Sequence, residues 1–166
     1  MRIIVVSDTH MHRMAKALPA RLVKELQQAD FIIHAGDWCD LSVADQLLKF
    51  APVDGVAGNN DGVEIRRRFG LKKTITVSDK KIGIIHGHGG RGSAEQHALE
   101  SFKGEEPDCL IYGHSHVPVL KEKNGMIVLN PGSPTDKRRQ SLYSFAVVDI
   151  VDGDISAEHI FYPDKR

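Results

Sequence analysis

The chain has 166 residues, with 22 Lys and Arg against 22 Asp and Glu, 41% hydrophobic residues and two Cys. This length predicts one domain, residues 1–166, and the ordinary apolar fraction excludes general disorder. The balanced charge gives no sign of a nucleic-acid polymer or a membrane surface as partner, and no apolar run approaches the roughly 20 residues of a spanning helix. Cys39 and Cys109 are too few for a disulfide framework, so we expect free thiols in a reducing, cytoplasmic compartment.

The first 60 residues alternate between strand and helix patterns. Ile3–Val6 and Phe31–Ile33 are apolar runs typical of parallel strands buried on both faces, and Val53–Ala57 is a third short strand. One helix is expected after Pro19, and another begins at a predicted capping box, Ser42–Asp45. We expect this second helix to bury its apolar positions, Val43, Leu47 and Leu48. The alternation predicts a parallel sheet with right-handed crossovers.

Hairpin patterns prevail in the second half. Thr74–Val77 and Lys81–His86 flank a hairpin-length connection, and Ser93 and Gln96 predict the capping box of a helix that ends before Pro107. Asn-Gly and Asp-Gly turns then punctuate further predicted strands, at Cys109–Tyr112, Val117–Glu122, Met126–Leu129, Leu142–Val151 and Ile155–Phe161. The chain is therefore expected to change from parallel units to antiparallel strands. This is a mixed α/β class whose edge strands could pair in a homodimer.

Five short clusters of polar residues and glycines follow five of these strands. They are Asp8-Thr9-His10, Gly36-Asp37-Trp38-Cys39-Asp40, Gly58-Asn59-Asn60-Asp61, His86-Gly87-His88-Gly89 and Gly113-His114-Ser115-His116. Because the carboxyl ends of strands in α/β sheets lie along one edge, where ligands bind, we expect these clusters to converge.

The clusters contain side chains that are typical metal ligands. Oxygen donors come from Asp8, Asp37 and Asn59, and imidazole donors come from His10, His86, His114 and His116. Seven such groups exceed what one ion needs but suit two ions that share a carboxylate. Oxygen and imidazole without thiolate favour Mn, Fe, Zn, Ni or Mg over a structural zinc site. Two ions about 3.5–4 Å apart can activate a water and neutralise an attacked phosphate.

Taken in order, these clusters resemble the motifs of the calcineurin-like metallophosphoesterase superfamily. The Asn130-Pro131-Gly132-Ser133 turn and the short chain resemble its small single-domain phosphodiesterase branch. The resemblance implies a four-layer-like β-sandwich of two mixed sheets flanked by helices. It also implies phosphoester hydrolysis by in-line attack of a metal-bridging hydroxide, commonly with Mn²⁺. One ion would be held by Asp8, His10, Asp37 and His116. The other would be held by Asp37, Asn59, His86 and His114, with Asp37 bridging.

One position departs from the family pattern. Many members carry His after the ligand Asn, where it protonates or orients the leaving group, and here that residue is Asn60. An amide donates a hydrogen bond but delivers no proton, so we expect substrates with good leaving groups to suffer least. His88 is expected either to orient the substrate or bind a phosphate oxygen, or else to support the metal ligands or the turn.

Three further residues are predicted around the site. Asp61 is expected to position a neighbouring histidine. Asp40 either supports the ligands in the same way or caps the turn before Ser42. Arg91 is a weaker candidate for a contact with the substrate phosphate.

The sequence thus predicts a metal-dependent phosphodiesterase or phosphatase that acts on a small phosphoester. The alternative is a non-catalytic protein-binding scaffold of the same fold, like the retromer scaffold subunit. Loss of ligands would favour the scaffold, whereas all seven expected ligand positions hold competent groups.

Overall fold

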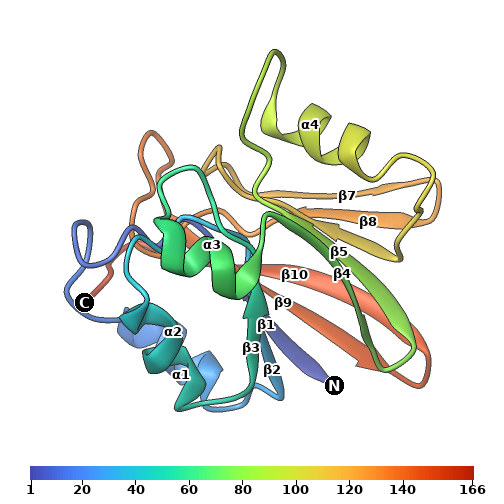
Figure 1. The fold of residues 1–166 in the computed structure, drawn as a ribbon. Coiled ribbons are helices and arrows are strands. Elements are labelled where there is room, and N and C mark those ends of the chain that lie inside the picture. Colours follow the sequence, from blue (N-terminus) through green and yellow to red (C-terminus); the bar gives the residue numbers. More distant parts are fainter.

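The computed structural model describes residues 1–166 as two five-stranded mixed sheets packed face to face, with four short helices on the outer surfaces (Figure 1). The fold is therefore the predicted α/β sandwich. Helices α1 to α3 cover one sheet and α4 covers the other (Figure 1).

The first sheet has the strand order β10-β9-β1-β2-β3. Its elements and covering helices are β1 (Arg2–Val6), α1 (Ala20–Leu26), β2 (Phe31–His34), α2 (Ser42–Leu48), β3 (Val53–Gly55), α3 (Val63–Phe69), β9 (Tyr143–Val151) and β10 (Asp154–Tyr162). Strands β1, β2 and β3 are parallel, as predicted from the alternating pattern, and β9 joins β1 antiparallel. The C-terminal hairpin thus extends the N-terminal parallel unit.

The second sheet has the order β4-β5-β6-β8-β7. Its elements are β4 (Lys72–Val77), β5 (Lys80–Ile85), α4 (Ala94–Ser101), β6 (Cys109–Ile111), β7 (Val119–Lys123) and β8 (Met126–Asn130). The expected change to antiparallel strands is wrong for β5, β6 and β8, which pair in parallel, whereas the mixed sheet implied by the resemblance is confirmed. The helix α4 is a crossover that returns the chain to the same end of the sheet, and only the hairpins β4–β5 and β7–β8 are antiparallel.

Apolar side chains fill three interfaces between the four layers. The middle one lies between the sheets, where Val5 and Ile33 of the first sheet pack with Ile84 and Ile111 of the second. Trp38 is the largest side chain under the first three helices, and Phe102 packs beneath α4. Because both faces of β1 and β2 are buried, the chain segments that leave their carboxyl ends start from a rigid base.

Local expectations at two helices had different outcomes. The capping box of α4 is present, since Ser93 and Gln96 bond reciprocally. The box predicted for α2 is not formed, because Ser42 is already the first helical residue and its N–H donates to Asp40 Oδ1 at 2.8 Å. Leu48 is 44% exposed rather than buried.

Both cysteines are free, with Cys39 exposed and Cys109 buried. None of the four helices combines the length and the apolar character that a membrane span requires.

Candidate metal centre

The predicted ligands come together at the carboxyl ends of the central strands. Backbone hydrogen bonds tie the loops to one another: Asp8 N–H donates to Gly36 O at 2.9 Å, and His10 N–H donates to Asp37 O at 3.1 Å. The loops after β5 and β6 are joined in the same way, because Gly113 N–H donates to His86 O at 3.0 Å. Convergence of the clusters, which the sequence predicted from topology, is thus present in the fold.

The backbone at this edge is unusual. Several predicted ligands have left-handed backbone conformations, with φ between 43° and 71°: Asp8, His10, Asp37, His114 and His116. Such values are uncommon for residues other than glycine, and they concentrate where function holds a side chain in place. The surrounding hydrogen bonds therefore hold these side chains in directions that a relaxed loop would not adopt.

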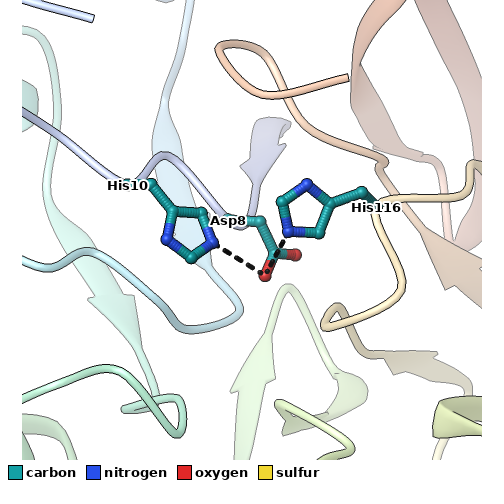
Figure 2. A group of neighbouring side chains, drawn as sticks. All are labelled: Asp8, His10 and His116. Carbon is teal, nitrogen blue, oxygen red and sulfur yellow. Dashed lines mark ion pairs between the residues drawn. The ribbon is translucent and has the colours of Figure 1, made fainter. Parts of the chain in front are cut away.

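Three of these residues form a buried group: Asp8, His10 and His116. Figure 2 shows both rings pointing their Nε2 atoms at the same carboxylate oxygen, Asp8 Oδ1. The separations are 3.8 Å from His10 and 3.5 Å from His116. None of the three residues is more than 6% exposed.

A second set of donors adjoins the buried group. His86 Nε2 lies 3.3 Å from Asp37 Oδ2 and 3.6 Å from Asp8 Oδ1, and all three side chains can face one ion. His10 Nε2 also lies 3.5 Å from Asp37 Oδ2. Asp37 therefore has a carboxylate oxygen between two histidines, which is the position expected of a shared ligand. Asp8 takes part in both sets as well.

The remaining two predicted ligands form what we call the exposed pair, Asn59 and His114. Asn59 is exposed and His114 is half-buried, and Asn59 Oδ1 lies 3.2 Å from His114 Nδ1. The ring centroid of His114 is 5.2 Å from that of His86, so the pair borders the second set of donors. His88 lies next to both rings, at 5.5 Å from His86 and 6.4 Å from His114. These residues form the more solvent-accessible side of the centre.

Hydrogen bonds at Nδ1 orient two of the histidine rings so that Nε2 faces the carboxylates. Nδ1 of His86 is 2.8 Å from Ala35 O, and Nδ1 of His116 is 2.6 Å from Asp136 O. A carbonyl can only accept, so each Nδ1 carries a proton, and the neutral form of each ring presents the Nε2 lone pair to an ion. The Nε2 atoms of His10, His86 and His116 and Asp8 Oδ1 are buried with no hydrogen-bond partner. Buried polar atoms without a partner are costly, and a cation would satisfy them together.

Donor spacing supports the same interpretation. Two ligand atoms about 2.1 Å from one ion are roughly 3.0–3.4 Å apart for octahedral to tetrahedral angles. The measured separations of 3.3–3.8 Å are close to this and too long for good hydrogen bonds. The residues therefore fit divalent cations.

The charges at the centre favour a cation. Burial lowers the pKa of His86, but the Asp37 and Asp8 carboxylates outweigh it and raise that pKa to about 9. Burial would raise the pKa of Asp37, yet His86 and the two Asn60 amide groups hold it well below its usual range. Burial lowers the pKa of His10 despite the neighbouring carboxylates. A positive charge between Asp8 and Asp37 is thus stabilised even when it is only a proton on His86.

Asp61 has a different role from the one predicted. Its carboxylate accepts three backbone N–H groups, from Asp37 at 2.8 Å, Cys39 at 2.7 Å and Gly58 at 2.7 Å. None of its hydrogen bonds goes to a histidine. Asp61 therefore ties the loop after β2 to the loop after β3, and it positions ligands through the backbone.

The other predicted residues lie at varying distances from the donors. Asn60 donates from its backbone N–H to Asp37 Oδ1 at 2.9 Å and from Nδ2 to Oδ2 at 2.8 Å, so it holds the Asp37 carboxylate in place. Asp40 is exposed and caps the turn before Ser42, which was the alternative expectation. Arg91 is exposed and lines a groove of about 930 Å³ beside α4 that contains none of the metal donors.

Sequence reasoning missed several supporting groups. The carbonyls of Ala35 and Asp136 fix two histidine rings, and no side-chain pattern signals a carbonyl. Ser133 Oγ donates to Asp8 O at 2.8 Å, and Thr135 Oγ1 donates to Thr9 O at 2.5 Å. Ser133 is the last residue of the Asn-Pro-Gly-Ser turn noted for its resemblance, and Thr135 lies two residues beyond it, so a signal for them was present.

The fold and the donor set define a metal-binding protein of the α/β sandwich class. Residues 1–153 match the family model of the calcineurin-like phosphoesterase superfamily domain. The chain belongs to this family.

Similar proteins agree with that assignment. A probable metallophosphoesterase of Methanocaldococcus jannaschii is 37% identical over 139 residues, covering 83% of this chain and 70% of the relative. A phosphodiesterase of the same organism is 31% identical over 147 residues, covering 80% and 83%. Vps29 from Entamoeba histolytica, solved in complex with Zn²⁺, superposes with a TM-score of 0.77 at 25% identity, covering 97% of this chain and 99% of Vps29.

Proposed function

We propose that this protein is a phosphodiesterase that hydrolyses small phosphoesters with two divalent ions, most simply Mn²⁺, although Ni²⁺, Fe²⁺, Zn²⁺ and Mg²⁺ suit the same donors. The observation that carries the proposal is the set of buried, unpartnered histidine nitrogens around two aspartates. The phosphodiesterase of M. jannaschii supports a diester rather than a monoester as substrate.

Each ion has its own set of ligands in this proposal. The buried group and Asp37 would hold one ion, and Asp37, His86 and the exposed pair would hold the other. When bound, such ions activate a water and neutralise the charge that develops on phosphate. Asp37 serves both sets, because its Oδ2 lies within 3.5 Å of both His10 Nε2 and His86 Nε2.

The residues on the accessible side would handle the substrate. His88 is half-buried, and its Nδ1 is buried without a hydrogen-bond partner, so Nε2 is the ring nitrogen that would donate to a phosphate oxygen. Asn60 places its amide beside the shared carboxylate and can donate to the leaving oxygen, but it supplies no proton. A phenolate leaves without protonation more readily than an alkoxide does, so activated aryl diesters would be the better substrates.

The test begins with protein stripped of metal by a chelator. Rates on bis(p-nitrophenyl) phosphate should be at background, return as Mn²⁺ is added, and saturate at two ions per chain. His116→Ala should prevent full recovery, whereas His12→Ala should behave as wild type because His12 is exposed and bonds only to Ser42. Hydrolysis that survives chelation, or a His116 variant with normal metal-dependent rates, would contradict the proposal.

A scaffold function is the second candidate. It is favoured by the likeness to Vps29 over nearly the whole of both chains. The two functions differ in their dependence on the metal ligands. A scaffold would bind a protein partner equally well before and after chelation and would show no metal-dependent rate, whereas the enzyme would lose hydrolysis.

A further inference from the structure

The three buried histidines of the centre differ in what holds their rings. Peptide carbonyls accept from Nδ1 of His86 and of His116, at 2.8 and 2.6 Å. Nδ1 of His10 instead faces a side chain, the thiol of Cys39, with the nitrogen and sulfur 3.4 Å apart. No other hydrogen-bond partner of the His10 ring occurs in the structure. His10 is thus the one buried histidine of the centre whose ring depends on a replaceable side chain.

The position of Cys39 is set by the loop and not by the thiol itself. Its N–H donates to Asp61 Oδ1 at 2.7 Å, and its backbone is left-handed with φ of 70°. The preceding residue, Trp38, is fully buried and its Nε1–H donates to Val56 O at 2.8 Å. These contacts fix the Cα of residue 39 and direct its side chain toward the His10 ring.

A ligand histidine needs a proton on the nitrogen that faces away from the ion. When Nδ1–H has an acceptor, this tautomer is favoured and Nε2 is available with its lone pair. A thiol sulfur is a weaker acceptor than a carbonyl, so it stabilises the correct tautomer less. A substitution at position 39 therefore changes the acceptor of His10 Nδ1–H. The acceptors of His86 and His116 are peptide carbonyls, which a substitution leaves in place.

We propose that Cys39 is a positioning residue for His10: its sulfur accepts the Nδ1–H, keeps Nε2 directed at Asp8 Oδ1, and thereby sets the affinity of the buried group for its ion. The part of this inference that concerns metal affinity rests on the proposed function. The part that concerns the His10 tautomer does not, because it is a property of the metal-free chain.

Three variants separate the acceptor from the backbone. Cys39→Ala removes the acceptor, and Cys39→Gly removes it while also suiting the left-handed φ. Cys39→Asn offers a carbonyl oxygen in place of sulfur and also tolerates that backbone. Cys39→Ala and Cys39→Gly should therefore lose the Nδ1–H tautomer of His10 to the same extent. Cys39→Asn should keep this tautomer at least as well as wild type.

The first readout is the tautomer of His10 in the metal-free protein, measured by long-range ¹H–¹⁵N NMR of the imidazoles at pH 8. Wild type and Cys39→Asn should show Nδ1–H, while Cys39→Ala and Cys39→Gly should show a mixture of tautomers. The second readout is Mn²⁺ binding by calorimetry. The Ala and Gly variants should weaken one of the two binding steps about tenfold, at the lower end of the range for such supporting contacts, and Cys39→Asn should restore it.

The two readouts test the positioning role of Cys39 and the proposed function separately. An unchanged His10 tautomer in Cys39→Ala and Cys39→Gly would overturn the positioning role, and so would equal losses of affinity in all three variants, which would point to loop packing instead. If wild type binds no Mn²⁺ but the tautomers change as described, the positioning role stands and the proposed function fails.

Discussion

The two sides of the candidate metal centre are built differently. The buried group, Asp8, His10 and His116, is at most 6% exposed, and backbone carbonyls or neighbouring hydroxyls fix most of its members. In the exposed pair, Asn59 is exposed and His114 is half-buried, and the two side chains bond only to each other. We infer that the side chains of the buried group are already held in place before an ion binds. Those of the exposed pair become fixed only when an ion and substrate bind. We therefore expect tighter metal binding at the buried group.

The largest effect should come from the residue that links the two sides. Asp37→Ala should reduce metal content from two ions per chain to none and hydrolysis to background, because neither ion keeps enough negative charge. Elemental analysis of the purified variants measures this directly. His12→Ala is the control and should keep both ions. Two ions retained in the Asp37 variant would show that the sides do not share this carboxylate.

The next effect tests the ranking of the two sides. His116→Ala should weaken one ion by more than the 10- to 100-fold typical of a supporting contact, since it removes a buried ligand. His114→Ala should weaken the other ion by about tenfold, because solvent reaches this half-buried position and a water can replace the ring. Calorimetric titration with Mn²⁺ compares them. Equal losses, or a larger loss at His114, would reverse the ranking.

A third change concerns the substrate-facing side. Asn60→His introduces a ring that can deliver a proton to the leaving group. General-acid catalysis typically raises the rate by about 10²–10⁴-fold. Rates on an unactivated alkyl diester should rise by at least tenfold, and rates on bis(p-nitrophenyl) phosphate should change much less. An equal gain on both substrates, or none on either, would assign proton delivery to another group.

The smallest effect is expected at the opposite end of β1. Glu25 bonds Arg21 at 2.6 Å and Arg2 at 2.9 Å, and these contacts lower the pKa of Glu25. A lowered folded-state pKa means that the stabilisation is complete above the unfolded value of about 4.3 and is lost as the pH falls through the folded value.

Glu25→Gln should accordingly lower the free energy of unfolding at pH 7 by no more than about 1 kcal/mol, with the difference vanishing in acid. Urea unfolding at pH 7 and pH 3 measures this. Metal binding should be unchanged on both sides of the centre. Altered Mn²⁺ affinity in this variant would mean that the sites respond to changes in overall stability.

The sequence predicted what depends on topology and residue type. Donor clusters after successive strands indicated a common edge, and the structure brings Asp8, Asp37 and His86 within reach of one ion. The sequence did not predict contacts that depend on exact loop geometry. The backbone role of Asp61 and the thiol contact of Cys39 arise from turns with positive φ, for which local residue patterns give no direction. The parallel pairing of β6 with β5 was missed because hairpin signals were extended across the α4 crossover.

In the proposed enzyme, two ions occupy one centre and share Asp37. Crystals soaked in Mn²⁺ and measured at an anomalous wavelength test it most directly. We expect two peaks about 3.5–4 Å apart. One should lie against the buried group and one against His86 and the exposed pair, with Asp37 contacting both. A single peak, or peaks away from these residues, would contradict it.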